Sequence, residues 1–240
     1  MGSERTDAHI HLIYGVDDGA KTPEDMQRML DEVHRNGITT VYATSHRTPG
    51  YREFPVDLYG ARLAEANAYC RAQGYPITVL PGAEILYTPA LHNEIEREEL
   101  QTLGDTDVVL AEFVPNVRYE EICTAIELLQ THGFTPMLAH IERYACLAPT
   151  LFSRGKAYAL KKKYPNVLLQ VNCGAVLSRM QKPNGRYIEQ WFRAELIDCI
   201  ASDAHDCGRR KNRMQKACDA LAPVCSPAYM TYLTTFGTNG

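Results

Sequence analysis

The sequence lacks three features that would each indicate a separate class of protein. It has no signal peptide and no apolar run long enough to cross a membrane, which argues against membrane insertion. Its eight cysteines include no Cys-x-x-Cys pair, the usual mark of a thiolate zinc site or a redox motif. The formal charge of −4 provides no general basic field for nucleic acid. We therefore expect a cytoplasmic protein with reduced thiols and no nucleic-acid partner.

Length and composition indicate one domain with a substantial core. The chain has 240 residues, of which 45% are hydrophobic, and this is about the size of one α/β barrel. It has no internal repeat, low-complexity tract or interdomain linker. Because Met1-Gly2-Ser3 has the character of an expression remnant, we assign residues 1–6 to a tag or disordered start and residues 7–240 to the domain.

Strand-like and helix-like segments alternate along the chain. Seven runs rich in Val, Ile, Leu and Ala, typical of strands buried on both faces, begin near Asp7, Thr39, Ile77, Asp107, Thr135, Val167 and Asp198. Amphipathic patterns between them predict helices at Glu24–Asn36, Leu58–Gln73, Ala90–Glu99, Glu120–His132, Lys156–Tyr164, Tyr187–Leu196 and Met214–Leu221. This repeated order favours βα units in a barrel over an antiparallel sandwich.

The helix at Glu24–Asn36 has the clearest ends. Thr22 is placed to cap its first turn, and Pro23 follows at a position where a missing N–H costs nothing. Asp25 lies three residues after the cap, and Gly37 ends the helix.

Imidazole and carboxylate side chains recur at the ends of the predicted strands or on the adjoining loop. They are His9, His11, Asp18, His46, Glu84, Glu112, His140, Asp203 and His205. His9 and His11 are two residues apart on a strand, so both point to the same face. A parallel barrel would bring all nine side chains to one rim, which is where barrel enzymes hold their catalytic groups.

The alternative is that these residues are scattered surface or hydrogen-bonded core groups. Four carboxylates gathered on one rim would repel one another, and two or three divalent ions remove that conflict. Imidazole and carboxylate ligands without cysteine suit Zn²⁺, Mn²⁺ or Fe. We therefore predict a polynuclear metal site for hydrolysis. His34, His92 and His132 fall on or beside predicted helices, and we assign them solvated or packing roles.

The ordered motifs resemble the PHP (polymerase and histidinol phosphatase) superfamily. They are Asp7-Ala-His-Ile-His, Asp17-Asp18-Gly19, Thr44-Ser45-His46, Gly82-Ala83-Glu84-Ile85, Glu112-Phe113, Ala139-His140-Ile141-Glu142-Arg143-Tyr144, Val171-Asn172 and Ala201-Ser202-Asp203-Ala204-His205. The run His140-Ile-Glu-Arg-Tyr144 resembles one branch of this superfamily, the CpsB/YwqE-type protein-tyrosine phosphatases of bacterial capsule and exopolysaccharide loci. The resemblance runs from about Asp7 to Arg209.

This resemblance implies a single-domain, distorted (β/α)7 TIM-like barrel with three divalent metal ions at the carboxyl ends of its strands. One ion would be held by His9, His11, Glu84 and Asp203. Glu84 would bridge to a second ion, held also by Glu112 and His140. The third ion would be held by Asp18, His46 and His205.

The resemblance also implies a reaction and a partner. A hydroxide between two ions would attack phosphorus in line with the departing tyrosyl oxygen, while Arg143 and Arg209 bind the phosphate. The proton donor is left open between His205 and a metal-bound water. The substrate would be the phosphotyrosine tail of a bacterial tyrosine autokinase that governs capsule or exopolysaccharide export.

Three segments lie outside the ligand motifs and have features of their own. Arg47–Pro55 is a surface loop beside His46 that we expect to act as a lid or substrate contact, with Arg47 as a substrate-binding residue. The stretch between Leu177 and Phe192 is shortened relative to the family pattern. Pro223–Gly240 lacks the Asn-Pro turn and closing helix expected there, which leaves homo-oligomerisation open.

Three functions other than a metal-dependent tyrosine phosphatase are also compatible with the sequence. Cysteine-dependent tyrosine phosphatases use Cys-x5-Arg, and this spacing occurs at Cys173–Arg179 and Cys207–Arg213, which is within what chance gives for this composition. Another PHP activity, such as a histidinol-phosphate or nucleotide phosphatase, is the alternative among hydrolases. A non-catalytic metal-binding regulator is the alternative outside them.

Overall fold

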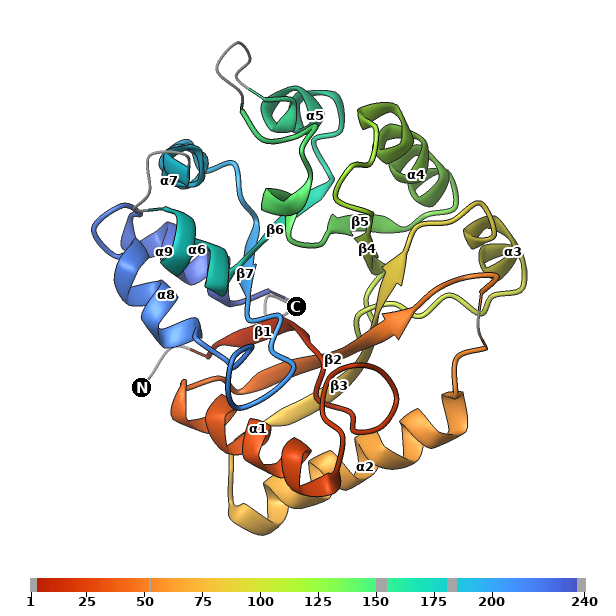
Figure 1. The fold of residues 1–240 in the computed structure, drawn as a ribbon, viewed down its shortest axis with the longest axis vertical. Coiled ribbons are helices and arrows are strands. Elements are labelled where there is room, and N and C mark those ends of the chain that lie inside the picture. The colour runs from red at the N-terminus through yellow and green to blue at the C-terminus, as the bar shows by residue number, and fades with distance from the viewer. Residues whose placement is uncertain (1–3, 52, 150–154, 181–184, 237–240) are drawn as a thin grey trace.

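Seven parallel strands form one sheet in the order in which they occur along the chain. They are β1 (Thr6–Ile10), β2 (Thr40–Arg47), β3 (Thr78–Leu86), β4 (Val108–Glu112), β5 (Thr135–Leu138), β6 (Leu168–Asn172) and β7 (Cys199–Ala201). The computed structural model describes residues 4–51, 53–149, 155–180 and 185–236 (Figure 1).

The two edges of this sheet also meet. The His11 N–H donates to the Ala204 carbonyl at 2.9 Å, and the Asp203 N–H donates to the His9 carbonyl at 2.8 Å. Ile10 and Ala204 pair in parallel at the same place. The sheet therefore curls into a nearly closed barrel, as the sequence predicts.

Helices surround the strands on the outside (Figure 1). They are α1 (Pro23–Arg35), α2 (Val56–Gln73), α3 (Leu91–Glu96), α4 (Tyr119–Thr131), η1 (Ile141–Arg143), α5 (Ala157–Lys163), α6 (Cys173–Arg179), α7 (Arg186–Arg193), α8 (Met214–Leu221) and α9 (Pro227–Thr234). Among the described residues, no helix combines the length and the apolar character needed to span a bilayer.

The start of α1 confirms the predicted helix cap. The Thr22 hydroxyl accepts the Asp25 N–H at 3.2 Å, and the Asp25 carboxylate accepts the Thr22 N–H at 3.1 Å. Each bond provides an acceptor for an N–H group at the helix start that has no i−4 carbonyl within the helix. The C-cap is Asn36, and Gly37 follows with a left-handed φ of 69°.

The core has an inner and an outer layer, because successive side chains of a strand point to opposite faces. The inner cluster is Ala8, Tyr42, Leu103, Val108, Leu110, Met137, Ala139, Cys199 and Ala201. The larger outer cluster packs the other strand faces against the helices. Tyr42 and Phe236 are 5.7 Å apart between ring centroids, so the end of the described chain contacts the inner cluster. The barrel interior is therefore filled, and the strand ends are left to carry the site.

The structure corrects the expectation for the C-terminal segment. A helix, α9, occupies Pro227–Thr234, where the sequence pattern led us to expect no closing helix. Its start is signalled locally: the Ser226 hydroxyl accepts the Tyr229 N–H at 3.2 Å, and Pro227 is the first helical residue. The Tyr229 hydroxyl donates to the Ile197 carbonyl at 2.7 Å, which fixes α9 beside the entry to β7.

Further differences from the sequence prediction include an additional helix and an earlier start of the first strand. The helix α6 begins at Cys173, directly after β6, and the sequence pattern did not predict it. Thr6, which the sequence assigned to the start segment, is the first residue of β1. The predicted shortening between Leu177 and Phe192 falls partly on residues 181–184, and the expression remnant on residues 1–3, all of which lie outside the described residues.

Candidate metal centre

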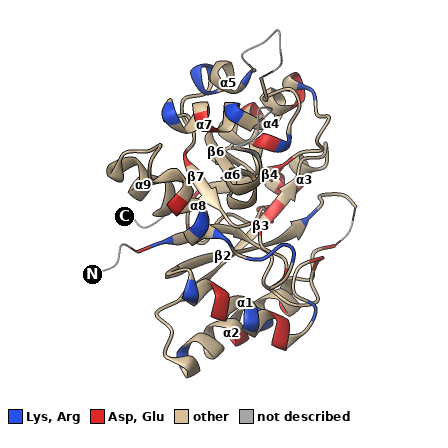
Figure 2. Ribbon diagram, turned by 60° about the vertical axis from the view of Figure 1, so that its left-hand side comes forward, with Lys and Arg blue, Asp and Glu red and all other residues tan. Residues whose placement is uncertain are grey.

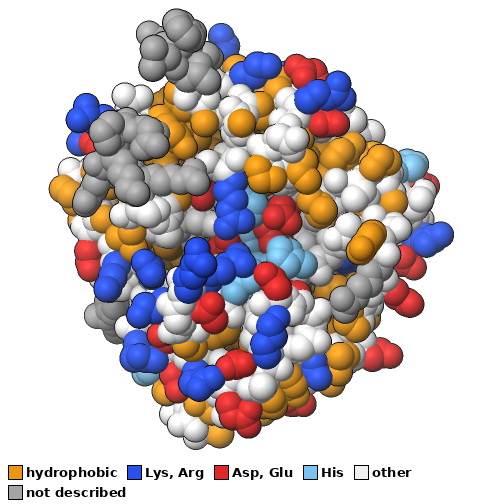
Figure 3. Space-filling view, in the orientation of Figure 1, with side chains coloured by type: hydrophobic (Ala, Val, Ile, Leu, Met, Phe, Trp, Pro, Cys, Tyr) orange, Lys and Arg blue, Asp and Glu red, His pale blue; other side chains and the backbone are white. Residues whose placement is uncertain are grey.

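The nine predicted ligands converge at the carboxyl ends of the strands. Their positions are β1 (His9), its end (His11), the following loop (Asp18), β2 (His46), β3 (Glu84), β4 (Glu112), the end of β5 (His140) and the segment after β7 (Asp203, His205). Figure 3 shows His and acidic side chains together in a hollow at the centre of this face, with Lys and Arg along one side. Residues far apart in the sequence thus form one cluster.

The first donor group joins β1, β3 and the segment after β7. Nε2 of His9 lies 3.1 Å from Nε2 of His11, and the Oε2 atom of Glu84 lies 3.2 and 3.3 Å from these two nitrogens. Oδ1 of Asp203 is 3.6 Å from both nitrogens. Ligand atoms around a tetrahedral ion with bonds of about 2.1 Å are about 3.4 Å apart. Three of these donors, from His9, His11 and Glu84, therefore already have the spacing of a metal site, and Asp203 lies beside the two imidazoles.

The second donor group shares Glu84 with the first. Its other oxygen, Oε1, lies 2.8 Å from Nε2 of His140, which in turn is 3.5 Å from Oε1 of Glu112. The two oxygens of one buried carboxylate thus face two different imidazole groups. This is the arrangement that a bridging carboxylate requires.

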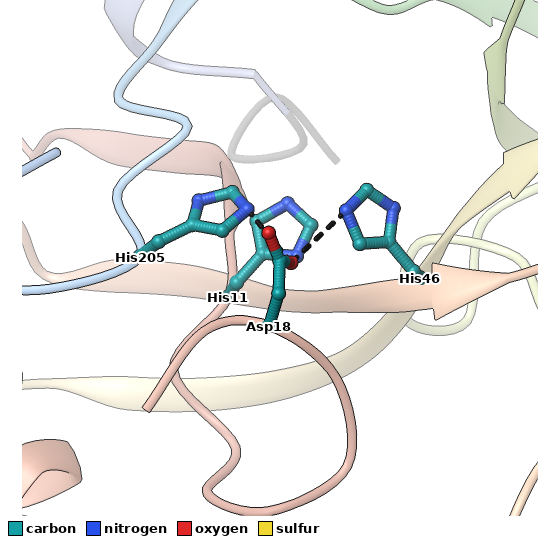
Figure 4. A group of neighbouring side chains, drawn as sticks. All are labelled: His11, Asp18, His46 and His205. Atoms are coloured by element: carbon teal, nitrogen blue, oxygen red, sulfur yellow. Dashed lines mark ion pairs between the residues drawn. The ribbon is translucent and has the colours of Figure 1, made fainter. Parts of the chain in front are cut away.

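In the third donor group, side chains from the loop after β1, from β2 and from the segment after β7 point toward one another (Figure 4). Oδ1 of Asp18 is 3.2 Å from Nε2 of His46 and 3.2 Å from Nε2 of His205. The His205 nitrogen is buried and makes no hydrogen bond to any described residue. An ion held by this nitrogen and Asp18 would serve both atoms, because a buried polar atom without a hydrogen bond is costly.

Neighbouring carboxylates raise the pKa of two imidazoles of this cluster, those of His11 and His140. Burial alone would lower the pKa of His11, but hydrogen bonds and charges from Asp17 and Glu84 outweigh it and raise the pKa to about 10. Burial also opposes the shift at His140, where contacts with Glu112 and Glu84 raise the pKa to about 9. A metal ligand must give up its proton, so divalent ions can replace these positive charges.

Two of the candidate ligands have a left-handed backbone. The φ angle is 33° at His140 and 50° at Asp203, a region that residues with a side chain rarely adopt. The His140 N–H donates to the Gln170 side chain at 2.7 Å, and the Asp203 N–H is held by the His9 carbonyl. Strained residues held in this way cluster at functional sites.

Three polar residues with no role predicted from the sequence orient the candidate ligands. Asp17 accepts from Nδ1 of His11 at 2.9 Å. The Oε1 atom of Gln170 lies 3.3 Å from Nδ1 of His9. The Asn172 amide donates to Asp203 at 2.7 Å. A signal for Gln170 existed in the sequence, because it is a polar residue within the buried strand β6.

Arginines border the donor groups on the side of β7. An Nη of Arg143 lies 2.5 Å from Oδ2 of Asp203. Arg210 reaches Asp18 at 3.3 Å and Asp203 at 3.2 Å. Arg209, the residue that the sequence analysis selected, is exposed and has no ion pair with any described residue. The structure thus brings Arg143 and Arg210 to the site, and Arg210 is a residue that the sequence analysis missed.

The same arginines line a basic pocket of about 460 Å³ next to Asp203. Its basic lining residues are Arg143, Arg209, Arg210, Lys211 and Arg213. Figure 2 shows Lys and Arg along the chain just before α8. The chain is acidic overall, so this pocket is a local positive field beside the donor groups.

Comparison with known proteins places the chain in a family. The family model for capsular polysaccharide synthesis, CpsB/CapC, matches residues 5–238. The chain belongs to this family. Tyrosine-protein phosphatase CpsB of Streptococcus agalactiae serotype V is 32% identical over 239 residues, which cover 96% of this chain and 90% of the relative. Tyrosine-protein phosphatase YwqE of Bacillus subtilis is 31% identical over 218 residues, 88% of this chain and 81% of the relative.

Solved structures agree with the CpsB/CapC assignment. A structure described as YwqE from Bacillus subtilis and CpsB from Streptococcus pneumoniae, unique metal-dependent tyrosine phosphatases, superimposes with a TM-score of 0.81 at 27% identity. The match covers 95% of this chain and 90% of that one. The phosphotriesterase homology protein of Escherichia coli, with a TM-score of 0.55 at 11% identity, shares the fold alone. The resemblance noted from the sequence motifs is confirmed.

Arg47 of this CpsB/CapC chain has partners on the loop side of the site. Its Nε lies 2.9 Å from a Glu94 oxygen, and its guanidinium is 5.5 Å from the centre of the Phe54 ring. It also lines a cavity of about 540 Å³ that includes His46 and Asp18. The loop therefore borders the site, while the role of Arg47 in binding substrate stays a prediction.

The Cys-x5-Arg spacings have no support in the structure of this family member. Cys173 is fully buried, and burial raises the pKa of its thiol well above the ordinary value. Burial also raises the pKa of Cys207. Attack on phosphorus requires a thiolate, so neither cysteine is suited to act as a nucleophile.

Proposed function

We propose that this chain is a metal-dependent protein-tyrosine phosphatase, a phosphoric monoester hydrolase that removes phosphate from tyrosine side chains. Glu84 carries the proposal, because its two carboxylate oxygens face separate imidazole groups at the barrel mouth. The named CpsB and YwqE relatives support the substrate class. The physiological substrate would be the phosphotyrosine tail of a bacterial tyrosine autokinase that controls capsule or exopolysaccharide synthesis.

The three donor groups would hold three divalent ions. Imidazole and carboxylate donors without cysteine suit Mn²⁺, Fe or Zn²⁺. Ions held there supply a nucleophile derived from water at neutral pH and neutralise phosphate charge. Asp17, Gln170 and Asn172 would keep the ligands in position, because their hydrogen bonds leave few other orientations for the rings and carboxylates.

The arginines would bind the phosphoryl oxygens of the substrate. The guanidinium groups of Arg143 and Arg210 lie against Asp203 and Asp18, at the edge of the donor groups. A guanidinium binds phosphate through two parallel hydrogen bonds, and it stabilises charge that develops during transfer. Arg209 lines the same pocket farther out and would attract the phosphorylated segment.

The tyrosyl oxygen is a good leaving group for such a site. Its pKa is near 10, so it needs less help from a proton donor than a serine hydroxyl would. Both nitrogens of His205 have neighbours, because Nδ1 lies 3.1 Å from the Asp203 carbonyl and Nε2 faces Asp18. We therefore assign His205 to ion binding rather than to proton donation.

The test combines metal analysis with turnover of a phosphotyrosyl peptide, histidinol phosphate and a nucleotide. The full chain should bind divalent ions and prefer the phosphotyrosyl peptide. His140→Ala should bind fewer ions and should lose activity. Cys173→Ser should retain activity. Preference for histidinol phosphate or the nucleotide would support another phosphoesterase. No turnover with Mn²⁺, Zn²⁺ or Fe²⁺ supplied would support a non-catalytic regulator.

A further inference from the structure

A second group of metal-ligand side chains lies outside the barrel mouth, in the layer of helices. His92 and Glu96 are one turn apart on α3, and His132 directly follows α4. Figure 1 shows α3 next to α4 on the outside of the barrel. One ligand atom from each residue lies within 4.8 Å of the other two. We propose that these three side chains bind one Zn²⁺ ion that ties α3 to α4.

The distances within this group favour coordination over hydrogen bonding. Oε1 of Glu96 lies 3.5 Å from Nε2 of His132 and 3.9 Å from Nε2 of His92. Hydrogen bonds between such atoms are about 2.7–3.2 Å long, so neither contact is one. Ligand atoms around a tetrahedral zinc ion are about 3.4 Å apart. The group is therefore spaced for an ion, and small side-chain movements would complete the geometry.

His132 is already oriented as a metal ligand. Its Nδ1 lies 2.8 Å from the carbonyl oxygen of Leu128, so Nδ1 carries the proton and donates. The lone pair is then on Nε2, the nitrogen that faces Glu96. Metal-bound histidines in proteins use the same device to fix the ring and its tautomer. The His92 ring is 5.8 Å away at an angle of 67°, and one nitrogen of each ring lies within 4.8 Å of the other.

Two imidazoles and one carboxylate supply three zinc ligands, and the exposed position leaves the fourth to water. The ion would join two βα units of the barrel. α3 follows the strand that carries Glu84, and α4 follows the strand that carries Glu112. Because the three ligands meet only in the folded chain, zinc at this position would stabilise the fold.

The experiment counts zinc per chain in the full protein without a polyhistidine tag. After dialysis against micromolar free Zn²⁺, elemental analysis should find one equivalent less in His92→Ala/His132→Ala than in wild type. His34→Ala is the matched control, because His34 is a helical histidine that stacks on Tyr75 away from this group. It should hold as much zinc as wild type. Equal zinc content in the wild type and the double variant would overturn the proposal.

Two substitutions at Glu96 separate coordination from any effect on folding. Glu96→His provides a third imidazole, so the transfer of one zinc ion to a competing chelator should be slower in this variant than in wild type. Glu96→Gln removes the anionic ligand, so that ion should leave faster. Added Zn²⁺ should also raise the Tm of wild type more than that of the double variant. Unchanged release rates in both Glu96 variants would contradict the assignment.

Discussion

Nδ1 of His11 lies 2.9 Å from a carboxylate oxygen of Asp17, and this contact decides which nitrogen of His11 faces the barrel mouth. The same carboxylate accepts the backbone N–H groups of His46 and Gly19, each at 2.9 Å. Asp17 therefore positions two candidate ligands and the loop that carries Asp18. The charges and hydrogen bonds around it hold the pKa of Asp17 far below the ordinary value despite its burial.

Asp17→Asn tests this positioning role. The substitution keeps the size of the side chain but removes the negative charge that makes the His11 ring a stronger ligand. We expect metal affinity to fall roughly 10–100-fold, with the fold retained. Metal titration followed by elemental analysis measures the change, and Asp25→Asn, at the exposed start of α1, is the control. Equal metal affinity in the wild type and Asp17→Asn would show that Asp17 does not support His11.

Gly19→Ala tests how closely the first loop packs on the metal centre. A Cβ at Gly19 would lie 2.0 Å from the carbonyl oxygen of His11, so the loop and the ligand cannot both keep their positions. We expect the free energy of unfolding to fall by at least about 2 kcal/mol. Gly60→Ala, within α2, meets no atom within 4 Å and should stabilise the protein by about 0.5–1 kcal/mol. Urea unfolding compares the two, and a similar effect of both would refute the packing argument.

Much of the fold and the ligand set follows from local patterns. The apolar runs locate the starts of all seven strands to within one residue, because strands buried on both faces need continuous apolar side chains. The His9-x-His11 spacing places two imidazoles on one face, and their Nε2 atoms meet at 3.1 Å. These features depend on period and position alone, so the sequence can predict them.

Features that depend on loop geometry could not be predicted. Arg209 and Arg210 are adjacent, and no pattern tells which guanidinium turns inward. The loop decides it: the Arg210 carbonyl accepts the His205 N–H at 2.9 Å, and Asp206 accepts the Arg210 N–H at 3.0 Å. The left-handed backbone at His140 and Asp203 is likewise set by contacts between strands. Such bonds join residues whose proximity appears only after folding.

Arg210→Ala and Arg209→Ala separate these neighbouring arginines. Arg210 reaches two candidate ligands and would contact the phosphate, so its loss should lower kcat/KM for a phosphotyrosyl peptide roughly 10- to 100-fold, the equivalent of about 1.5–3 kcal/mol. Arg209 is exposed, so its loss should cost less than about fivefold. Steady-state kinetics on both variants measures the difference. A larger loss for Arg209→Ala would assign the phosphate contact to Arg209, as the family resemblance implies.

Tyr59→Phe tests how α2 supports the strands that carry His46 and Glu84. The buried Tyr59 hydroxyl donates to the Ala43 carbonyl of β2 at 2.6 Å and accepts the Gly82 N–H of β3 at 3.0 Å. Removing it leaves two buried backbone groups without that partner, and each such group costs about 1–3 kcal/mol. We expect the free energy of unfolding in urea to fall by at least the cost of one such group, about 1–3 kcal/mol. The kcat should be nearly unchanged at temperatures where the variant is folded. Tyr14→Phe is the control, because the Tyr14 hydroxyl donates a hydrogen bond to the exposed Glu65. A fall in kcat without loss of stability would instead mean that Tyr59 acts on the geometry of the metal centre.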